Sequence, residues 1–189
     1  ADGGIIELPD NLKVGSPVAD ALALDTVIDF EVTPNRPDWL GVVGIARDLG
    51  AKGIGKFTLP EVKPVPGKFP SPVKIHIEAP EACPVFAGRL IRGVKNGESP
   101  KWLKDRLTAI GLRAVSVLVD VTQYLTIDLG RPLHAFDDAK LKGDIGARLA
   151  GSGEQVAALN GKTYTLDDTM VVIADEAAAL GIGGIMGGA

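Results

Sequence analysis

The segment Ile145–Asp175, "IGARLAGSGEQVAALNGKTYTLDDTMVVIAD", decides the fold because it carries successive short strand patterns with no helix between them. Asn160 and Gly161 separate two of these patterns and are typical of a type I′ hairpin turn. The last residues, 180–189, read "LGIGGIMGGA" and add a further strand pattern. Strands joined by such short connections predict a largely antiparallel sheet.

Two further patterns precede this region. Residues 26–33, "TVIDFEVT", alternate apolar and acidic side chains and predict a strand, while residues 38–53, "DWLGVVGIARDLGAKG", predict a helix capped by Asp38. Residues 73–78, "VKIHIE", again predict a strand, with His76 on its solvated face.

Two helical patterns lie in the middle of the chain. Residues 99–113, "SPKWLKDRLTAIGLR", predict a helix with Ser99 as N-cap and Pro100 as first helical residue. Residues 114–130, "AVSVLVDVTQYLTIDLG", fit both a strand and a helix, and their length favours a helix over the second half. A few helices among many mixed and antiparallel strands, without regular β–α–β alternation, predict the α+β class.

Composition limits the possible functions. The chain has 189 residues, 46% of them hydrophobic, which suffices for a core, and its net charge of −4 provides no global attraction for nucleic acid, so any RNA contact must be local. The single Cys83 excludes an internal disulfide and suits a cytoplasmic protein. No apolar run reaches the ~20 residues that span a bilayer, and residues 1–10, "ADGGIIELPD", do not show the basic start and long apolar stretch typical of a signal peptide. Both chain ends predict a piece of a longer protein.

Several catalytic motifs are absent. The glycine-rich end misses the dinucleotide fingerprint because Met186 stands three residues after Gly183, and no GxSxG nucleophile motif occurs. The glycines therefore form either a strand packed closely on another backbone or the wall of a pocket. Asp137 and Asp138 are adjacent, which disfavours a shared metal ion, and Asp137 is better placed as the N-cap of the following "DAKLKG".

His134, in "LGRPLHAFDDAK", has two interpretations. Its imidazole can donate to a carbonyl or to Asp137 and so hold the loop, or it can line a pocket. Pro132 stiffens the approach to His134, and Arg113 and Gln123 supply nearby donors in the sequence. The residues alone do not decide between these interpretations.

Four segments in order resemble the β subunit of bacterial phenylalanine–tRNA ligases across essentially the whole chain. They read "VTPNRPDWLGVVGIARDLGA", "EAPEACPVFAGRLIRGV", "SPKWLKDRLTAIGLRAVSVLVDVTQYLTIDLGRPLHAFD" and "GIGGIMGGA". The resemblance implies that residues 1–59 end a discontinuous adaptor domain and that residues 71–189 form an editing domain truncated at its C-terminus. Five prolines between Phe57 and Val73 make residues 60–70 the predicted linker.

The resemblance also implies a function. An apolar synthetic pocket rejects an added hydroxyl only weakly, so an enzyme that charges phenylalanine needs a second site to remove tyrosine. The editing module of this family hydrolyses tyrosine from tRNA(Phe) with a positioned water molecule. The parent enzyme would attach phenylalanine to tRNA(Phe) with ATP and Mg²⁺ as an α2β2 assembly. The partners implied are tRNA(Phe), its tyrosyl form and the α subunit, with no membrane and no cofactor or metal in this segment.

Site residues follow from the same resemblance. His134 would be the catalytic residue, orienting water or substrate near the ester. The editing pocket would be lined by Arg113, Gln123, Pro132, Gly187 and Gly188. Gln123 departs from the family, which has asparagine in the corresponding "VDVTNY", so its role is open.

Two expectations concern activity. The family's glutamate for the tyrosine hydroxyl, and a threonine-containing segment that closes the cavity, would lie beyond Ala189, so the chain is expected to hold half a site and to hydrolyse tyrosyl-tRNA very weakly by itself. The alternatives are a noncatalytic RNA- or protein-interaction module with the same fold and a freestanding hydrolase, against which the missing nucleophile argues.

Overall fold

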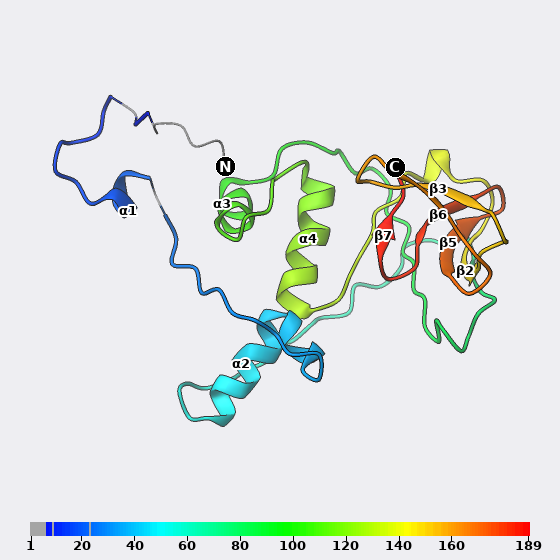
Figure 1. Cartoon of the computed structure of the whole chain (residues 1–189), viewed down its shortest axis with the longest axis horizontal. Helices are drawn as coiled ribbons and strands as arrows, with labels where there is room; N and C mark the ends of the chain where they lie inside the picture. Colours follow the sequence, from blue (N-terminus) through cyan, green and yellow to red (C-terminus); the bar gives the residue numbers. More distant parts are fainter. Residues whose placement is uncertain (1–6, 9, 23) are drawn as a thin grey trace. The chain divides into compact units, whose positions relative to one another are not determined.

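A computed structural model describes residues 7–8, 10–22 and 24–189 (Figure 1). The helices are α1 Val18–Ala21, the 3₁₀-helix η1 Pro37–Leu40, α2 Val42–Ala51, α3 Lys101–Ala109, α4 Val117–Leu129 and the 3₁₀-helix η2 Asp138–Lys140. The strands are β1 Ile75–Ile77, β2 Ile145–Leu149, β3 Gln155–Ala157, β4 Thr163–Thr165, β5 Val171–Asp175, β6 Ala179–Ile182 and β7 Met186–Gly187. This mixture of helices and strands confirms the α+β class.

The main sheet has five strands in the order β1-β2-β5-β6-β7. β1 runs parallel to β2, and every other neighbouring pair is antiparallel, as the short connections predicted. β3 and β4 form a separate two-stranded hairpin. A bridge between Ala158 and Gly188 joins the hairpin loop to the residue that follows β7, so this loop lies against the glycine-rich edge of the sheet.

Apolar side chains from the sheet and the hairpin share one core. Alternate residues of β2 and β5 are buried, which is the pattern of strands with one covered face. The core residues are Ala150, Val156, Leu166, Val172 and Ala174, with Tyr164, Ala179 and Ile182 packed around them. This core supports the C-terminal strands rigidly.

The hairpin turn differs from the type I′ prediction. The N–H of Gly161 donates to the carbonyl of Ala158 at 2.9 Å, so Leu159 and Asn160 are the central residues of that turn. Gly161 follows with φ 77°, and the side chain of Asn160 accepts from the N–H of Lys162 at 3.1 Å. Asn160 and Gly161 thus belong to a longer hairpin loop, in which the left-handed glycine follows the turn. The hairpin was predicted correctly, but its turn type was not.

The chain divides into two compact units. One contains residues 1–57 and 96–133, and the other contains residues 58–95 and 134–189. The proline-rich residues 57–73 contain no helix or strand, as predicted. The functional boundaries expected from the sequence, at residues 59, 70 and 71, remain a prediction.

The first unit corrects two predictions. Residues 24–33 form no strand: they have no partner strand among the residues described, and a strand needs a hydrogen-bonded neighbour. Phe30 instead contacts Trp39 edge-on, with ring centroids 6.0 Å apart. The predicted helix over residues 38–53 is split into η1 and α2 at Gly41, which is extended and is the N-cap of α2 in place of Asp38.

The split has a steric cause. A Cβ atom on Gly41 would overlap the backbone of Gly130, which ends α4 in the left-handed conformation with φ 65°. The backbones of the two segments therefore approach more closely than any side chain would allow. α4 also packs on α3, where Leu103 and Leu107 are buried.

The ambiguous segment forms a helix over 13 residues, longer than the predicted second half. The N-cap of α3 is Pro100, whereas Ser99 is buried and its hydroxyl donates to Asp120 Oδ2 at 2.5 Å. Asp120, only 1% exposed, also accepts from the N–H of Val115 at 2.8 Å. Ser99 was predicted wrongly as a cap because this long-range acceptor takes its hydroxyl.

Candidate functional site

The side chain of His134 lies against the bare backbone of Gly187 in β7. A Cβ atom on Gly187 would lie 2.8 Å from His134 Cε1 and 2.9 Å from Leu159 Cδ1, so only glycine leaves room for both side chains. The Phe136 ring covers another side of the imidazole, with ring centroids 4.5 Å apart. His134 thus has a glycine and two apolar side chains around it.

These neighbours set the protonation state of His134. The residue is exposed, yet partial burial of its ring lowers the pKa of His134 from its ordinary value near 6.5. The imidazole is therefore largely neutral near pH 7, with one nitrogen able to donate and the other able to accept. Among the described residues, none forms a hydrogen bond with either ring nitrogen of His134. Both nitrogens therefore remain available to a ligand.

The structure argues against the loop-holding interpretation of His134. Asp137, its proposed partner, instead accepts from the N–H of Ala139 at 3.1 Å and caps η2. The N-cap prediction for Asp137 is confirmed. The carboxylate of Asp137 is thereby engaged at the start of η2, and the imidazole lies in a tilted arrangement against the Phe136 ring.

The two predicted glycines occupy different environments. Gly188 donates its N–H to the carbonyl of Leu180 at 2.9 Å, and a Cβ atom there would overlap that carbonyl oxygen. Gly188 thus permits close packing of two backbones. Gly187 faces side chains instead, and its carbonyl accepts from the N–H of Leu159 at 3.0 Å, which positions Leu159 beside His134.

Three predicted pocket residues belong to the other compact unit. Gln123 is half-buried on α4, and Pro132 is exposed in the segment after α4. Arg113 is exposed and lines a hollow of about 460 Å³ in that unit, together with Lys104, Thr108, Gly111, Leu112 and Ala114. The structure therefore brings together His134 and Gly187, and the pocket roles of the other residues stay predictions.

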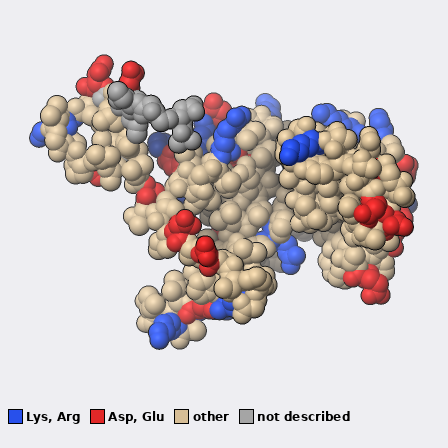
Figure 2. Space-filling model, viewed as in Figure 1, with Lys and Arg blue, Asp and Glu red and all other residues tan. Residues whose placement is uncertain are grey.

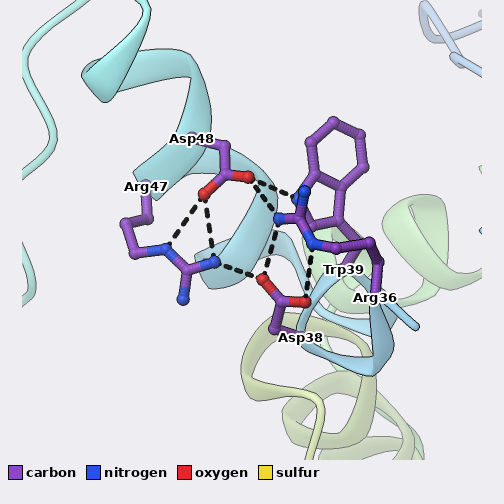
Figure 3. A network of polar contacts seen from close by, with 5 residues as sticks. All are labelled: Arg36, Asp38, Trp39, Arg47 and Asp48. Atoms are coloured by element: carbon purple, nitrogen blue, oxygen red, sulfur yellow. Dashed lines mark hydrogen bonds and ion pairs between the residues drawn. The ribbon is translucent and has the colours of Figure 1, made fainter.

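A polar network in the first unit was not anticipated (Figure 3). Arg36 binds Asp38 through two hydrogen bonds of 3.0 and 2.9 Å and also pairs with Asp48. The Trp39 indole donates to Asp48 at 2.8 Å, and Arg47 bridges both carboxylates. These contacts join η1 to α2, and the only sequence signal for them is the recurrence of arginine and aspartate in "NRPD" and "ARD".

The network keeps its carboxylates ionised. Hydrogen bonds from Arg36 and Trp39 lower the pKa of Asp48 to about 2, and the hydrogen bond from Arg36 holds the pKa of Asp38 far below its usual value. Because each arginine is neutralised by an aspartate, the network leaves no unbalanced charge for a ligand. We assign it to the conformation of the η1–α2 turn.

A second histidine lies at a hollow of about 300 Å³ beside β1 and β2. His76 Nε2 is 2.9 Å from Asp144 Oδ2, and the N–H of Lys74 donates to the other oxygen of Asp144 at 2.8 Å. The Lys74 and His76 hydrogen bonds lower the pKa of Asp144. His76 is exposed, as predicted. Within the described part of the chain, no three His, Cys, Asp or Glu side chains are grouped so as to hold a metal ion.

Comparison with known proteins defines the class. Residues 82–189 match the B3/4 domain, and the chain belongs to this family.

Three curated relatives extend the match to 98% of the chain. It is 59% identical over 189 residues to the phenylalanine–tRNA ligase β subunit of Paramagnetospirillum magneticum and 56% identical over 190 residues to that of Rhodospirillum rubrum. The corresponding subunit of Novosphingobium aromaticivorans is 53% identical over 185 residues. These comparisons confirm the resemblance stated from the sequence. The chain spans about a quarter of the length of these relatives, 24% in the first two.

Over residues 7–8, 10–22 and 24–189, no helix combines the length and the apolar character needed to cross a bilayer.

Proposed function

We propose that this chain is part of the β subunit of a phenylalanine–tRNA ligase and contributes to an editing pocket that hydrolyses tyrosyl-tRNA(Phe). The observation that carries the proposal is the contact between His134 and Gly187, where a largely neutral imidazole borders a backbone without a side chain. The similarity to phenylalanine–tRNA ligase β subunits over 98% of the chain supports the choice of substrate.

The reaction is the hydrolysis of an ester. A water oxygen forms a bond to the tyrosyl carbonyl carbon, and the bond from that carbon to the ribose oxygen breaks. The ribose oxygen takes up a proton, and tyrosine and uncharged tRNA are released. No covalent bond to the protein is required, in agreement with the absence of a nucleophile motif from the sequence.

His134 acts by positioning in this reaction. With one nitrogen accepting and the other donating, the neutral ring orients the attacking water or the terminal ribose hydroxyl beside the ester. A charged imidazolium would lack the acceptor, so the lowered pKa of His134 favours this role near neutral pH. Phe136 and Leu159 restrict the directions in which the imidazole can turn.

Gly187 leaves room for the His134 imidazole and the Leu159 side chain to lie close to the backbone of β7, which places the imidazole at this edge of the sheet. The resemblance to the ligase β subunits is what proposes a substrate-binding role for Arg113, Gln123, Pro132 and Gly188. Rejection of tyrosine through its hydroxyl needs a polar partner for that hydroxyl, because apolar contacts discriminate weakly against an added hydroxyl.

The remaining functions belong to the proposed parent enzyme. In an α2β2 ligase of the cytoplasm, the α subunit would charge tRNA(Phe) with phenylalanine, using ATP and Mg²⁺. We assign no residue of this chain to ATP or Mg²⁺. Its contribution to protein biosynthesis is the removal of tyrosine, which requires contact with the 3′ end of the tRNA.

The test uses the assembled ligase that contains this chain. His134→Ala should slow deacylation of tyrosyl-tRNA(Phe) by about ten- to a hundredfold, the range expected when a positioning group is lost, and should leave phenylalanine charging unchanged. His76→Ala, in the other histidine of the chain, is the matched control and should deacylate normally. Normal deacylation by His134→Ala, or tRNA binding without deacylation by the unmodified ligase, would refute the proposal.

A further inference from the structure

Basic residues concentrate in one part of the second unit. Residues 58–95 contain six lysines and arginines and three acidic residues, whereas residues 134–189 contain four basic and eight acidic residues. The six are Lys63, Lys68, Lys74, Arg89, Arg92 and Lys95, all exposed. Figure 2 shows Lys and Arg side chains and Asp and Glu side chains in scattered groups over the face in view. The excess of positive charge is therefore local.

Three of these cations belong to one surface. Arg92 places its guanidinium 4.5 Å from the centre of the Phe69 ring, and Arg89 donates to the carbonyl of Val65 at 2.7 Å. Lys68 precedes Phe69 directly in the chain. The two arginines thus contact the proline-rich segment at Val65 and Phe69, on either side of Lys68 in the sequence, and we call Lys68, Phe69, Arg89 and Arg92 the basic surface.

The charges of the basic surface are not neutralised within the protein. The ion pairs found among the described residues involve Arg36, Arg47, His76, Lys101, Lys104 and Arg148. None of them includes a cation of the basic surface. In the same unit, Arg148 shows the contrast, because it binds Glu154 through two hydrogen bonds of 2.8 and 2.7 Å.

The geometry suits a phosphate. The Arg92 guanidinium carbon lies 4.5 Å over the centre of the Phe69 ring, and its N–H groups donate no hydrogen bond to the described residues, so they can donate to a phosphate oxygen. Phe69 is 38% exposed, so part of its ring is also open to a base. Unpaired cations beside an exposed aromatic ring are the combination that binds single-stranded nucleic acid.

We propose that the basic surface binds the phosphodiester backbone of RNA outside the pocket of His134. The choice of RNA over an anionic membrane rests on the proposed function. The proline-rich segment agrees with this choice, since it forms no helix that could lie in a membrane interface. Binding here would hold a strand through its backbone, without selecting its sequence.

The experiment measures fluorescence anisotropy of a labelled polyuridylate oligonucleotide with the 189-residue chain as salt is varied. The triple variant Lys68→Gln, Arg89→Gln, Arg92→Gln should bind at least about tenfold more weakly at about 50 mM salt. The slope of log K against log salt should fall by about 2, because each lost phosphate contact on a single strand contributes about 0.7.

The matched control changes three cations elsewhere in the same unit. Lys140→Gln, Lys142→Gln, Lys162→Gln removes the same net charge and should change binding less than twofold. If both triple variants weaken binding equally, only the net charge matters and the proposal is refuted. Binding of the unmodified chain to phosphatidylserine vesicles but not to polyuridylate would refute it as well.

Arg89→Gln also removes the hydrogen bond from Arg89 to the carbonyl of Val65, which could destabilise the fold. Folding of each variant is therefore monitored by circular dichroism. If the triple variant unfolds, the single variant Lys68→Gln is measured in its place. Its slope of log K against log salt should fall by about 0.7. An unchanged slope would overturn the proposal. Polyuridylate carries no aminoacyl ester, so its binding does not depend on the hydrolysis that His134 is proposed to support. His134→Ala should bind it normally even where tyrosyl-tRNA deacylation is lost, which separates failure of this inference from failure of the proposed function.

Discussion

The buried carboxylate of Asp120 should be the most sensitive polar site in the first unit. Burial disfavours its ionised form, but the Ser99 hydroxyl and the N–H groups of Val115 and Ser116 outweigh that cost and hold the pKa of Asp120 below its ordinary value. Each hydrogen bond to a charged group contributes about 1.5–3 kcal/mol. Asp120→Ala removes the Ser99 and Val115 bonds and leaves the buried Ser99 hydroxyl without its acceptor, so we expect a loss of about 3–5 kcal/mol.

Two milder variants separate the contributions of the individual hydrogen bonds to the free energy of unfolding. Asp120→Asn keeps one acceptor oxygen and should cost about 2 kcal/mol, and Ser99→Ala, which removes a single bond, should cost a similar amount. The assay is urea unfolding followed by tryptophan fluorescence. Both tryptophans of the chain, Trp39 and Trp102, lie in the first unit, so the signal reports that unit alone.

The effect of Asp120 should also depend on pH. Because its pKa is lower in the folded state, its contribution is fully present above the unfolded value of about 3.9 and is lost as the pH falls through the folded value. The difference in unfolding free energy between Asp120→Asn and the unmodified chain should therefore shrink at low pH. Asp105→Asn, at an exposed pair with Lys101, is the control and should change stability by less than about 0.5 kcal/mol. Equal stabilities for Asp120→Asn and Asp105→Asn at pH 7 would refute the reasoning.

Three further predictions concern backbone contacts and the site. Gly41→Ala should destabilise the first unit by about 1–3 kcal/mol in urea, because its methyl group would overlap the Gly130 backbone. The pKa of His134 should fall below its ordinary 6.5 in an NMR titration, since apolar neighbours disfavour the charged ring. Gly187→Ala should displace the His134 and Leu159 side chains. Because His134 would then be misplaced, deacylation of tyrosyl-tRNA by the parent ligase should slow about tenfold, while charging with phenylalanine continues.

Controls for these three predictions come from the same chain. A methyl group on Gly97 would contact nothing within 4 Å, so Gly97→Ala should leave stability almost unchanged. A His134 pKa at or above 6.5 in the NMR titration would contradict the burial argument. Gly151→Ala makes only ordinary contacts and should deacylate normally; a Gly187→Ala ligase as active as this control would show that the glycine does not position His134.

Local patterns predicted much of the fold. Alternating side chains identified β1, short strand patterns without an intervening helix identified β2 and β5, and helical spacing identified α3. The prediction failed over residues 26–33, where the alternation was present but no partner strand was. It also failed at Ser99, whose hydroxyl bonds to Asp120 across the α3–α4 contact and not to its own helix.

The site shows the same division. By itself the sequence determined the α+β class, the helix-starting role of Asp137 and, through its resemblance to a family, the residues to be tested around His134. Only the tertiary structure decided that Gly187 touches His134 while Gly188 packs on the Leu180 backbone. Adjacent residues of a strand face opposite sides, so which glycine meets the imidazole depends on how β7 pairs with β6 and on where the hairpin loop meets that edge.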